Sequence, residues 1–149
     1  MNETEKALRA ALIGAWLLER WEVQYADGHV TLPFGADAHG LIIYSADGWM
    51  SATMCAARRT QLDAPTPNSA SLESRAAVFA EYLGYGGHWS LDGNTIVHHV
   101  MHSLNPILIG SEQRRDATLS GDVLSLEAAE QTPRPRIHRI RWRRAAGHD

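Results

Sequence analysis

The chain has 149 residues, a formal net charge of −3 at pH 7 and a single cysteine, Cys55. This length predicts one domain, residues 1–149, with a sizeable hydrophobic core. The lone cysteine excludes an internal disulfide framework, and the acidic balance disfavours a surface built as a whole for nucleic acid. No stretch approaches the roughly 20 apolar residues of a membrane span, and the acidic N-terminal segment is unlike a signal peptide. We therefore expect a cytoplasmic protein with no membrane partner.

The first predicted element is a short helix over residues 5–13. Asn2 or Thr4 is suited to cap it. The residues that recur on one face of this helix are apolar: Leu8, Ala11 and Leu12. Gly14 is expected to end the helix before the first strand.

From residue 16 onward the sequence has the pattern of a β protein. Asp-Gly pairs lie between apolar runs at 27–28, 47–48 and 92–93, and such pairs favour hairpin turns because the turn residues must tolerate positive φ. No helical crossovers separate the runs, which disfavours a parallel sheet. The pattern predicts an all-β antiparallel sandwich or barrel of about eight strands. The expected strands cover residues 16–25, 40–46, 49–55, 87–91, 95–104, 116–119, 123–129 and 136–142.

One polar segment interrupts this regular spacing. Residues 58–74 are rich in Pro, Ser, Asn and Ala, and residues 75–83 have the pattern of a short helix. An excursion of this length in a compact barrel is either a functional lid or a mobile surface insertion. The sequence leaves both interpretations open.

Residues 95–104, TIVHHVMHSL, concentrate histidines. On a helix, His98 and His102 would be i,i+4 neighbours, as in some zinc sites. The β-branched residues after an Asp-Gly turn favour a strand instead, on which these positions lie about 13 Å apart and His99 points to the other face. Because zinc–nitrogen bonds are about 2 Å long, we expect no metal site.

The orientation of these histidines depends on the preceding hairpin. With a two-residue turn at 92–93, cross-strand pairing gives four side chains one shared face: Tyr85, Trp89, His98 and His102. A three-residue turn would reverse the faces and bring His88 opposite His98. The apolar neighbours of His98 and His102 favour an inward orientation. There the imidazoles are either hydrogen-bonded core groups or general acid–base groups.

Several motifs follow one another in a recognisable order. They are LIGAWL at 12–17, GLIIYSADGWMSA at 40–52, YLGYGGHW at 82–89, TIVHHV at 95–100, Pro106, Gly110, EQRR at 112–115 and LSGDVLSL at 119–126. In content and order they resemble the bacterial and fungal lipocalin-like domain family. The resemblance implies a calycin-type, up-and-down antiparallel β-barrel with an internal cavity for a small, mostly apolar molecule. Residues 107–108 and 116–117 depart from the family, which often has Asn-Trp and aromatic residues there, so no ligand is transferred from relatives.

Within such a barrel, alternation along residues 113–119 directs Arg115 inward. There it is suited to anchor a carboxylate, enolate or phenolate, or to form an internal salt bridge with an acid such as Glu81. The candidate catalytic residues are His98, His102, Tyr85 and Arg115. The candidate ligand-binding residues are Trp16, Tyr44, Trp49, Met54, Tyr82, Trp89, Val100 and Gln113.

The C-terminal residues 134–144 are rich in arginine. Arginines interleaved with Trp142 are one pattern of nucleic-acid binding. However, His138, Ile140 and Trp142 alternate with arginines, which predicts an amphipathic closing strand with an arginine outer face. We therefore expect no nucleic-acid partner.

Three functions are consistent with the sequence. The first is a barrel that binds a small apolar molecule. The second is a cofactor-independent enzyme, of the isomerase, cyclase or dehydratase (lyase) type, acting on a carbonyl-bearing apolar substrate in the same cavity. In it, His98 or His102 would be acid or base, and Tyr85 and Arg115 would stabilise oxyanion charge. The third is an oligomeric or interaction module without a ligand, and the sequence leaves a homodimer open.

Overall fold

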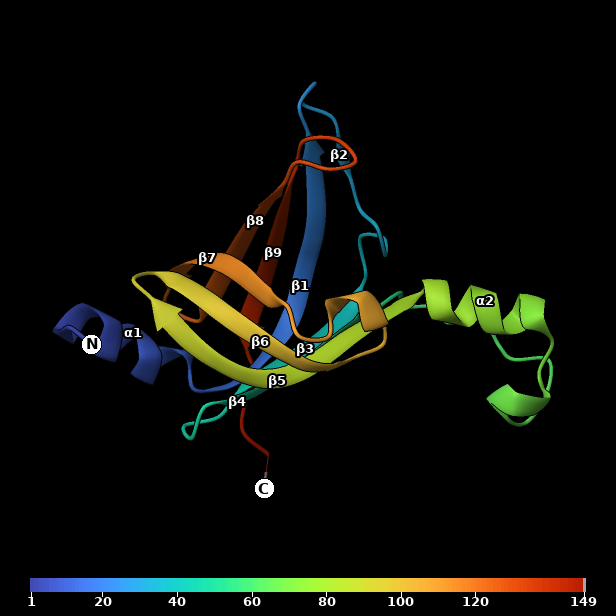
Figure 1. Cartoon of the computed structure of the whole chain (residues 1–149), viewed down its shortest axis with the longest axis horizontal. Helices are drawn as coiled ribbons and strands as arrows, with labels where there is room; N and C mark the ends of the chain where they lie inside the picture. The colour runs from blue at the N-terminus through green and yellow to red at the C-terminus, as the bar shows by residue number, and fades with distance from the viewer. Residues whose placement is uncertain (149) are drawn as a thin grey trace.

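The computed structural model describes residues 1–148, and nine strands of this part form one antiparallel sheet. The sheet closes into a barrel because β1 pairs with β3 on one side and with β9 on the other (Figure 1). From β3 to β9 each strand pairs with the next strand along the chain, as expected for an up-and-down barrel. The strands are β1 (Gly14–Tyr25), β2 (Val30–Thr31), β3 (His39–Tyr44), β4 (Trp49–Cys55), β5 (Tyr82–Asp92), β6 (Thr95–Ser103), β7 (Glu112–Ser120), β8 (Val123–Glu130) and β9 (Arg136–Arg144).

The predicted all-β barrel is confirmed, with β2 as one short additional strand at the edge of β1. The closed wall therefore has eight strands, β1 and β3 to β9. A barrel of this size leaves interior space only for side chains or one small ligand. The described chain also contains short helices: α1 (Glu3–Leu12), α2 (Leu72–Ala80), and the 3-10 turns η1 (Pro67–Ser69) and η2 (Pro106–Leu108). None of its helices is long and apolar enough to cross a membrane.

Helix α1 lies at one end of the barrel (Figure 1). The Asn2 side chain caps it by accepting a hydrogen bond from the backbone N of Glu5, at 2.8 Å. Leu12 is fully buried, and its carbonyl accepts a hydrogen bond from Nε1 of Trp16, at 3.0 Å. These contacts attach the helix to the first residues of β1.

Helix α2 projects from the opposite side of the barrel (Figure 1). It begins three residues earlier than residue 75, at Leu72, because Ser71 caps it by accepting a hydrogen bond from the backbone N of Ser74. It also ends earlier than expected, and Tyr82 is already the first residue of β5. The preceding loop is attached by Glu81, whose carboxylate accepts hydrogen bonds from the backbone N and the hydroxyl of Thr60.

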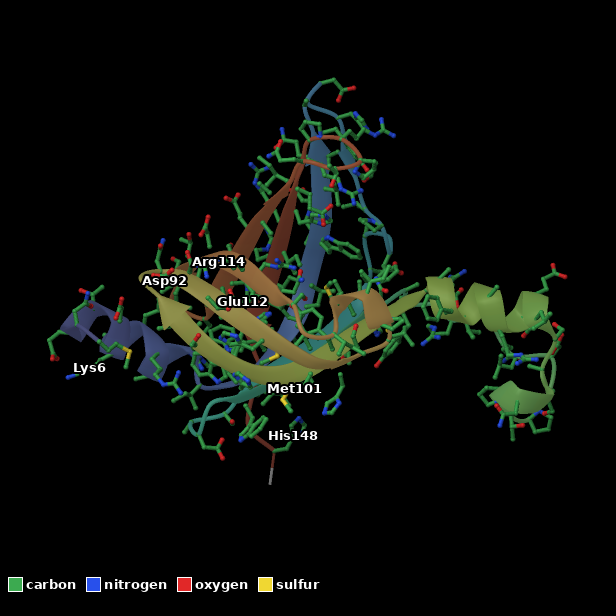
Figure 2. All side chains as sticks on the ribbon, in the orientation of Figure 1. Lys6, Asp92, Met101, Glu112, Arg114 and His148 are labelled. Atoms are coloured by element: carbon green, nitrogen blue, oxygen red, sulfur yellow. The ribbon has the colours of Figure 1, made fainter. Side chains whose placement is uncertain are left out.

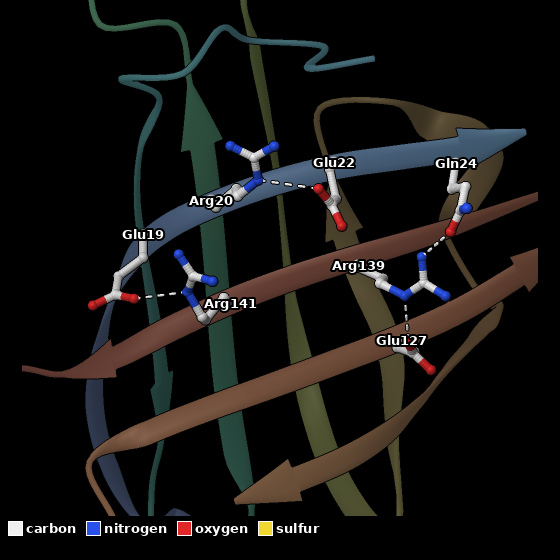
Figure 3. A network of polar contacts seen from close by, with 7 residues as sticks. All are labelled: Glu19, Arg20, Glu22, Gln24, Glu127, Arg139 and Arg141. Carbon is white, nitrogen blue, oxygen red and sulfur yellow. Dashed lines mark hydrogen bonds and ion pairs between the residues drawn. The ribbon is translucent and has the colours of Figure 1, made fainter. Parts of the chain in front are cut away.

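The arginines of β9 lie on the outer surface of the barrel. Arg139 pairs with Glu127 on β8, and Arg141 pairs with Glu19 on β1 at 2.8 Å (Figure 3). The alternate residues Ile140 and Trp142 are buried. The predicted amphipathic closing strand is therefore confirmed, and its arginine face is neutralised in part by acids of the neighbouring strands.

The hairpin between β5 and β6 sets the orientation of the histidines. Asp92 pairs with Thr95, so the central turn residues are Gly93 and Asn94, one position later than expected. Trp89 consequently faces His98 instead of residue 96, a shift of two residues. A shift of two leaves every side chain on its expected face, since the side-chain period of a strand is two. His98 is therefore buried inside the barrel, as predicted.

A β-bulge changes the second half of this pairing. Gly87 pairs with Val100, but Gly86 pairs with His102, so β6 has Met101 as an extra residue. Met101 lies on the outer side of β6 (Figure 2), and His102 is also exposed. The expected inward orientation of His102 is wrong, because one extra residue reverses the alternation beyond the bulge.

Candidate functional site

The barrel contains a cavity of about 500 Å³. Most of its wall is apolar, with contributions from strands all around the barrel: Ile42, Ala52, Met54, Leu83, Leu126 and Trp142. The polar side chains in the wall are fewer and come mainly from β5 to β9: Tyr82, Tyr85, His98, Ser103, Asn105, Gln113, Arg115, Glu130 and His138. An apolar cavity with a few convergent polar groups is typical of small-molecule sites.

The cavity extends to the end of the barrel where α2 and η2 lie. Phe79 and Ala80 of α2 and Leu104 and Leu108 near η2 line it there, and Phe34 adds a ring from the segment before β3. Residues 107–108, which depart from the family pattern, differ in their surroundings. Leu108 lines the cavity, whereas Ile107 is 85% exposed.

Two tyrosines bind the two ring nitrogens of His98. The Tyr44 hydroxyl lies 2.7 Å from Nε2, and the Tyr85 hydroxyl lies 2.6 Å from Nδ1. Tyr85 and His98 lie on the neighbouring strands β5 and β6, whereas Tyr44 lies on β3, which does not pair with β6. His98 is 1% exposed and Tyr44 is fully buried. The arrangement holds the imidazole in one orientation.

Burial keeps these three groups neutral near pH 7. It lowers the pKa of His98 to about 3, and the positive charge of Arg115 acts in the same direction. Burial also raises the pKa of Tyr44 well above its ordinary value and raises that of Tyr85, although Arg115 opposes both changes. Neutral His98 therefore carries a single ring hydrogen, so one ring nitrogen donates a hydrogen bond to one tyrosine and the other nitrogen accepts one from the second tyrosine.

Arg115 is directed into the barrel, as alternation predicted. Its neighbour Arg114 lies outside with Asp92 and Glu112 (Figure 2), where Arg114 forms ion pairs with both acids. Nη1 of Arg115 donates a hydrogen bond to the carbonyl of Arg114, at 2.9 Å. Among residues 1–148, however, no carboxylate forms an ion pair with Arg115. The suggested partner Glu81 is engaged outside by Arg59 and Thr60, so the expected internal salt bridge is wrong.

A second polar group, centred on His138, also lines the cavity, although none of its residues was among the candidate site residues. Trp21 Nε1 donates a hydrogen bond to Nδ1 of His138, at 3.1 Å. Nε2 of His138 lies 3.2 Å from the Glu130 carboxylate, which also pairs with Arg136 at 2.6 Å. Burial lowers the pKa of His138, although Glu130 opposes this change. The alternation that directs Ile140 and Trp142 inward also directs His138 inward, and this signal was sufficient to find it.

The predicted site residues fall into three groups. Those that line the cavity are Tyr85, His98, Arg115, Met54, Tyr82 and Gln113. Those that are buried outside the cavity wall are Trp16, Tyr44, Trp89 and Val100. His102 and Trp49 lie on the outer surface, where Trp49 is 52% exposed and packs edge-on against His88. The last two are therefore too remote to contact a molecule inside the barrel.

The structure places the chain in the class of closed up-and-down β-barrels, whose interior at this size is either filled by side chains or able to hold one small molecule. Residues 13–146 match the family model of the lipocalin-like domain, and the chain belongs to this family. The match confirms the resemblance at the level of the lipocalin-like domain. A search among curated proteins found no match to this chain.

Proposed function

We propose that this protein binds a small, largely apolar molecule in the barrel cavity. The observation that carries the proposal is the cavity itself, about 500 Å³ in volume and lined mostly by apolar side chains. Volumes of about 300–1,000 Å³ are typical of small-molecule sites, whereas a barrel without a ligand fills its interior with side chains. The few inward polar groups would set the orientation of the guest.

Ligand identification tests this proposal directly. Protein purified under mild conditions is analysed by native mass spectrometry, and organic extracts of the same sample are compared with extracts of an unrelated barrel. Calorimetry with a series of apolar acids, alcohols and aromatic compounds then measures affinity. We expect at least one class to bind in the micromolar range with a negative heat-capacity change, the mark of apolar burial. Absence of binding across the whole series would contradict the proposal.

An enzyme is the second candidate, and the series Tyr44–His98–Tyr85 beside Arg115 favours it. In such an isomerase, cyclase or dehydratase, Tyr85 and Arg115 would stabilise negative charge that develops on a substrate carbonyl oxygen. Both nitrogens of His98 are already engaged by tyrosines. His98 would therefore act through Tyr85 and would not take a proton from the substrate itself, and the proton that leaves the carbon next to the carbonyl would pass to a base in the solvent.

Proton exchange distinguishes catalysis from binding alone. Apolar ketones and β-keto acids are incubated with the protein in D2O, and deuterium incorporation next to the carbonyl is followed by NMR. Incorporation that Tyr85→Phe and Arg115→Gln each abolish supports the enzyme. If wild-type protein binds these compounds without accelerating exchange, cyclisation or dehydration, the enzyme candidate is rejected and the binding function stands.

A further inference from the structure

The direction of the hydrogen bonds around His98 is determined by Tyr44. The Tyr44 side chain is fully buried, and within residues 1–148 its hydroxyl has His98 Nε2 as its one hydrogen-bond partner. If Nε2 carried the ring hydrogen, the Tyr44 hydroxyl would accept that hydrogen bond and its own hydrogen would have no acceptor. Buried donors are rarely left unpaired, because the lost hydration is not replaced. Tyr44 therefore donates to Nε2.

This direction determines the tautomer of His98 and the role of Tyr85. A neutral imidazole has one donor and one acceptor nitrogen. Since burial lowers the pKa of His98 to about 3, and Nε2 is the acceptor, Nδ1 carries the hydrogen. Nδ1–H then donates to the Tyr85 oxygen, at 2.6 Å. The hydrogen of the Tyr85 hydroxyl is left free to donate, and Tyr85 lies in the cavity wall.

Arg115 adds a positive charge to the same region. Its guanidinium donates hydrogen bonds only, and its charge influences the pKa of Tyr44, Tyr85 and His98. Glu130 is the one carboxylate in the cavity wall, as far as the structure describes it, and it is already paired with Arg136 and close to His138. The amide of Gln113, in the same wall, is engaged on both sides, because its Oε1 accepts from Arg115 at 3.5 Å and its Nε2 donates to Ser111. This part of the cavity therefore offers the Tyr85 hydroxyl as a donor and, at Arg115, a positive charge without a carboxylate partner among the described residues.

The geometry points to an apolar acid as the ligand, bound as its anion, with the anionic oxygen accepting hydrogen bonds from the Tyr85 hydroxyl and from Arg115. Tyr44 is a positioning residue: it does not contact the ligand, but it makes Tyr85 a donor by fixing the tautomer of His98. This assignment rests on the proposed binding function and names the chemical class of its ligand. A carboxylate is favoured over an alcohol because its oxygens only accept hydrogen bonds and its negative charge lies opposite Arg115, whereas an alcohol oxygen accepts a hydrogen bond but brings no charge.

Matched ligand pairs test the assignment. The probes are dodecanoate against 1-dodecanol and 2-naphthoate against 2-naphthalenemethanol, each titrated into the protein at pH 7.5 by calorimetry. We expect wild type to prefer the acid of a pair by about tenfold or more, the effect of a charge-assisted hydrogen bond. Arg115→Gln and Tyr85→Phe should each reduce this preference severalfold. Tyr44→Phe should reduce it too, whereas Tyr25→Phe, which removes a hydroxyl outside the cavity, should leave it unchanged.

The tautomer of His98 is measured without any ligand or destabilising substitution. In protein labelled with ¹⁵N-histidine, long-range ¹H–¹⁵N spectra at pH 7 distinguish a protonated Nδ1 from a protonated Nε2. We expect Nδ1–H in wild type, and loss of this single tautomer in Tyr44→Phe. A merely structural role of Tyr44 would lower stability without changing the tautomer or the acid preference.

Two results would overturn the assignment. One is the Nε2–H tautomer in wild type. The other is equal or tighter binding of the alcohols, with the Tyr85→Phe variant behaving like wild type. If neither member of either pair binds, and the wider apolar series does not bind either, then the binding function itself has failed, and this outcome differs from loss of acid preference alone.

Discussion

The Tyr44 hydroxyl lies 2.7 Å from Nε2 of His98, although the two residues are 54 positions apart in the chain. Tyr44 belongs to β3 and His98 to β6, and these strands are not neighbours in the sheet. The hydrogen bond therefore crosses the interior and connects two parts of the wall that no backbone ladder joins. Tyr44 and His98 are nearly inaccessible to water, so water cannot replace the hydrogen bond between them.

Replacing His98 with leucine is expected to destabilise the fold by about 2–4 kcal/mol, because the buried Tyr44 hydroxyl and the partly buried Tyr85 hydroxyl lose their partner. Urea unfolding followed by tryptophan fluorescence measures the change. His102→Leu is the matched control, since His102 is exposed, and it should alter stability by no more than about 0.5 kcal/mol. Equal stability of the two variants would show that the tyrosine–histidine contacts contribute nothing measurable.

The pKa of His98 predicts an acid-sensitive fold. Folded His98 has a pKa of about 3, whereas an imidazole in the unfolded chain has a pKa of about 6.5. Between these values the unfolded chain binds a proton that the folded chain does not. The free energy of unfolding is therefore fully retained above about pH 6.5 and falls as the pH is lowered toward 3, by at most about 5 kcal/mol for this group.

Unfolding curves at pH 7, 6, 5 and 4.5 check this pH dependence. His98→Gln removes the titrating group but keeps hydrogen-bonding capacity, so its stability should fall less steeply over this range. The ring signals of folded wild type should not titrate above about pH 4, since the imidazole remains neutral there. A midpoint between pH 6 and 7 for His98 in the folded protein is incompatible with the prediction.

Gly87 permits the close approach of strands at the β-bulge. A Cβ atom at this position would lie 1.9 Å from the carbonyl oxygen of His99, so alanine cannot be accommodated without a backbone shift. We expect Gly87→Ala to cost about 3 kcal/mol or more in thermal or urea unfolding. Gly86→Ala is the matched control, because its Cβ would meet no atom closer than 3.3 Å. If the two variants are equally stable, the bulge is not as tight as the structure indicates.

Ala52 is a position at which the cavity can be filled. It lines the cavity and is buried, so Ala52→Phe would place a ring in the space proposed for the ligand. Affinity for the best-binding apolar compound should fall about tenfold or more, while stability changes by about 1 kcal/mol or less, since the ring enters existing space. Ala129→Phe makes the same change at an exposed position. It should bind like wild type, and loss of binding there would remove the argument for the cavity.

The β1 to β9 wall was largely predictable from sequence, because strand alternation and turn residues act over short distances. The inward direction of Arg115 followed from the alternation of Gln113, Arg115 and Ala117, and the structure agrees. The predicted faces of the β5–β6 hairpin were also correct as far as the bulge, although its turn was predicted one residue too early. The pairing shifted by two residues, which returns each side chain to the same face.

The orientation of His102 was not predictable in this way. It depends on a bulge that forms where Gly87 approaches the backbone of His99, and nothing in the alternation of residues 95–104 indicates the extra residue. Trp49 is a residue type suited to a cavity wall, but it lies on the outside. Side chains alternate between the two faces of β4, and Met50 takes the interior face. Residue type identified suitable side chains, and only the register decided which of them face the cavity.

The sequence by itself determined an antiparallel barrel with a histidine and an arginine among its inward residues, since periodicity and turn chemistry are local properties of the chain. Only the tertiary structure decided that His98 lies between Tyr44 and Tyr85, that Arg115 has no carboxylate partner within residues 1–148, and that His102 is outside. Closure of the sheet through β1 and β9 brings distant strands face to face across the interior. Contacts of that kind depend on the curvature and register of the whole wall, and no segment of the chain encodes them alone.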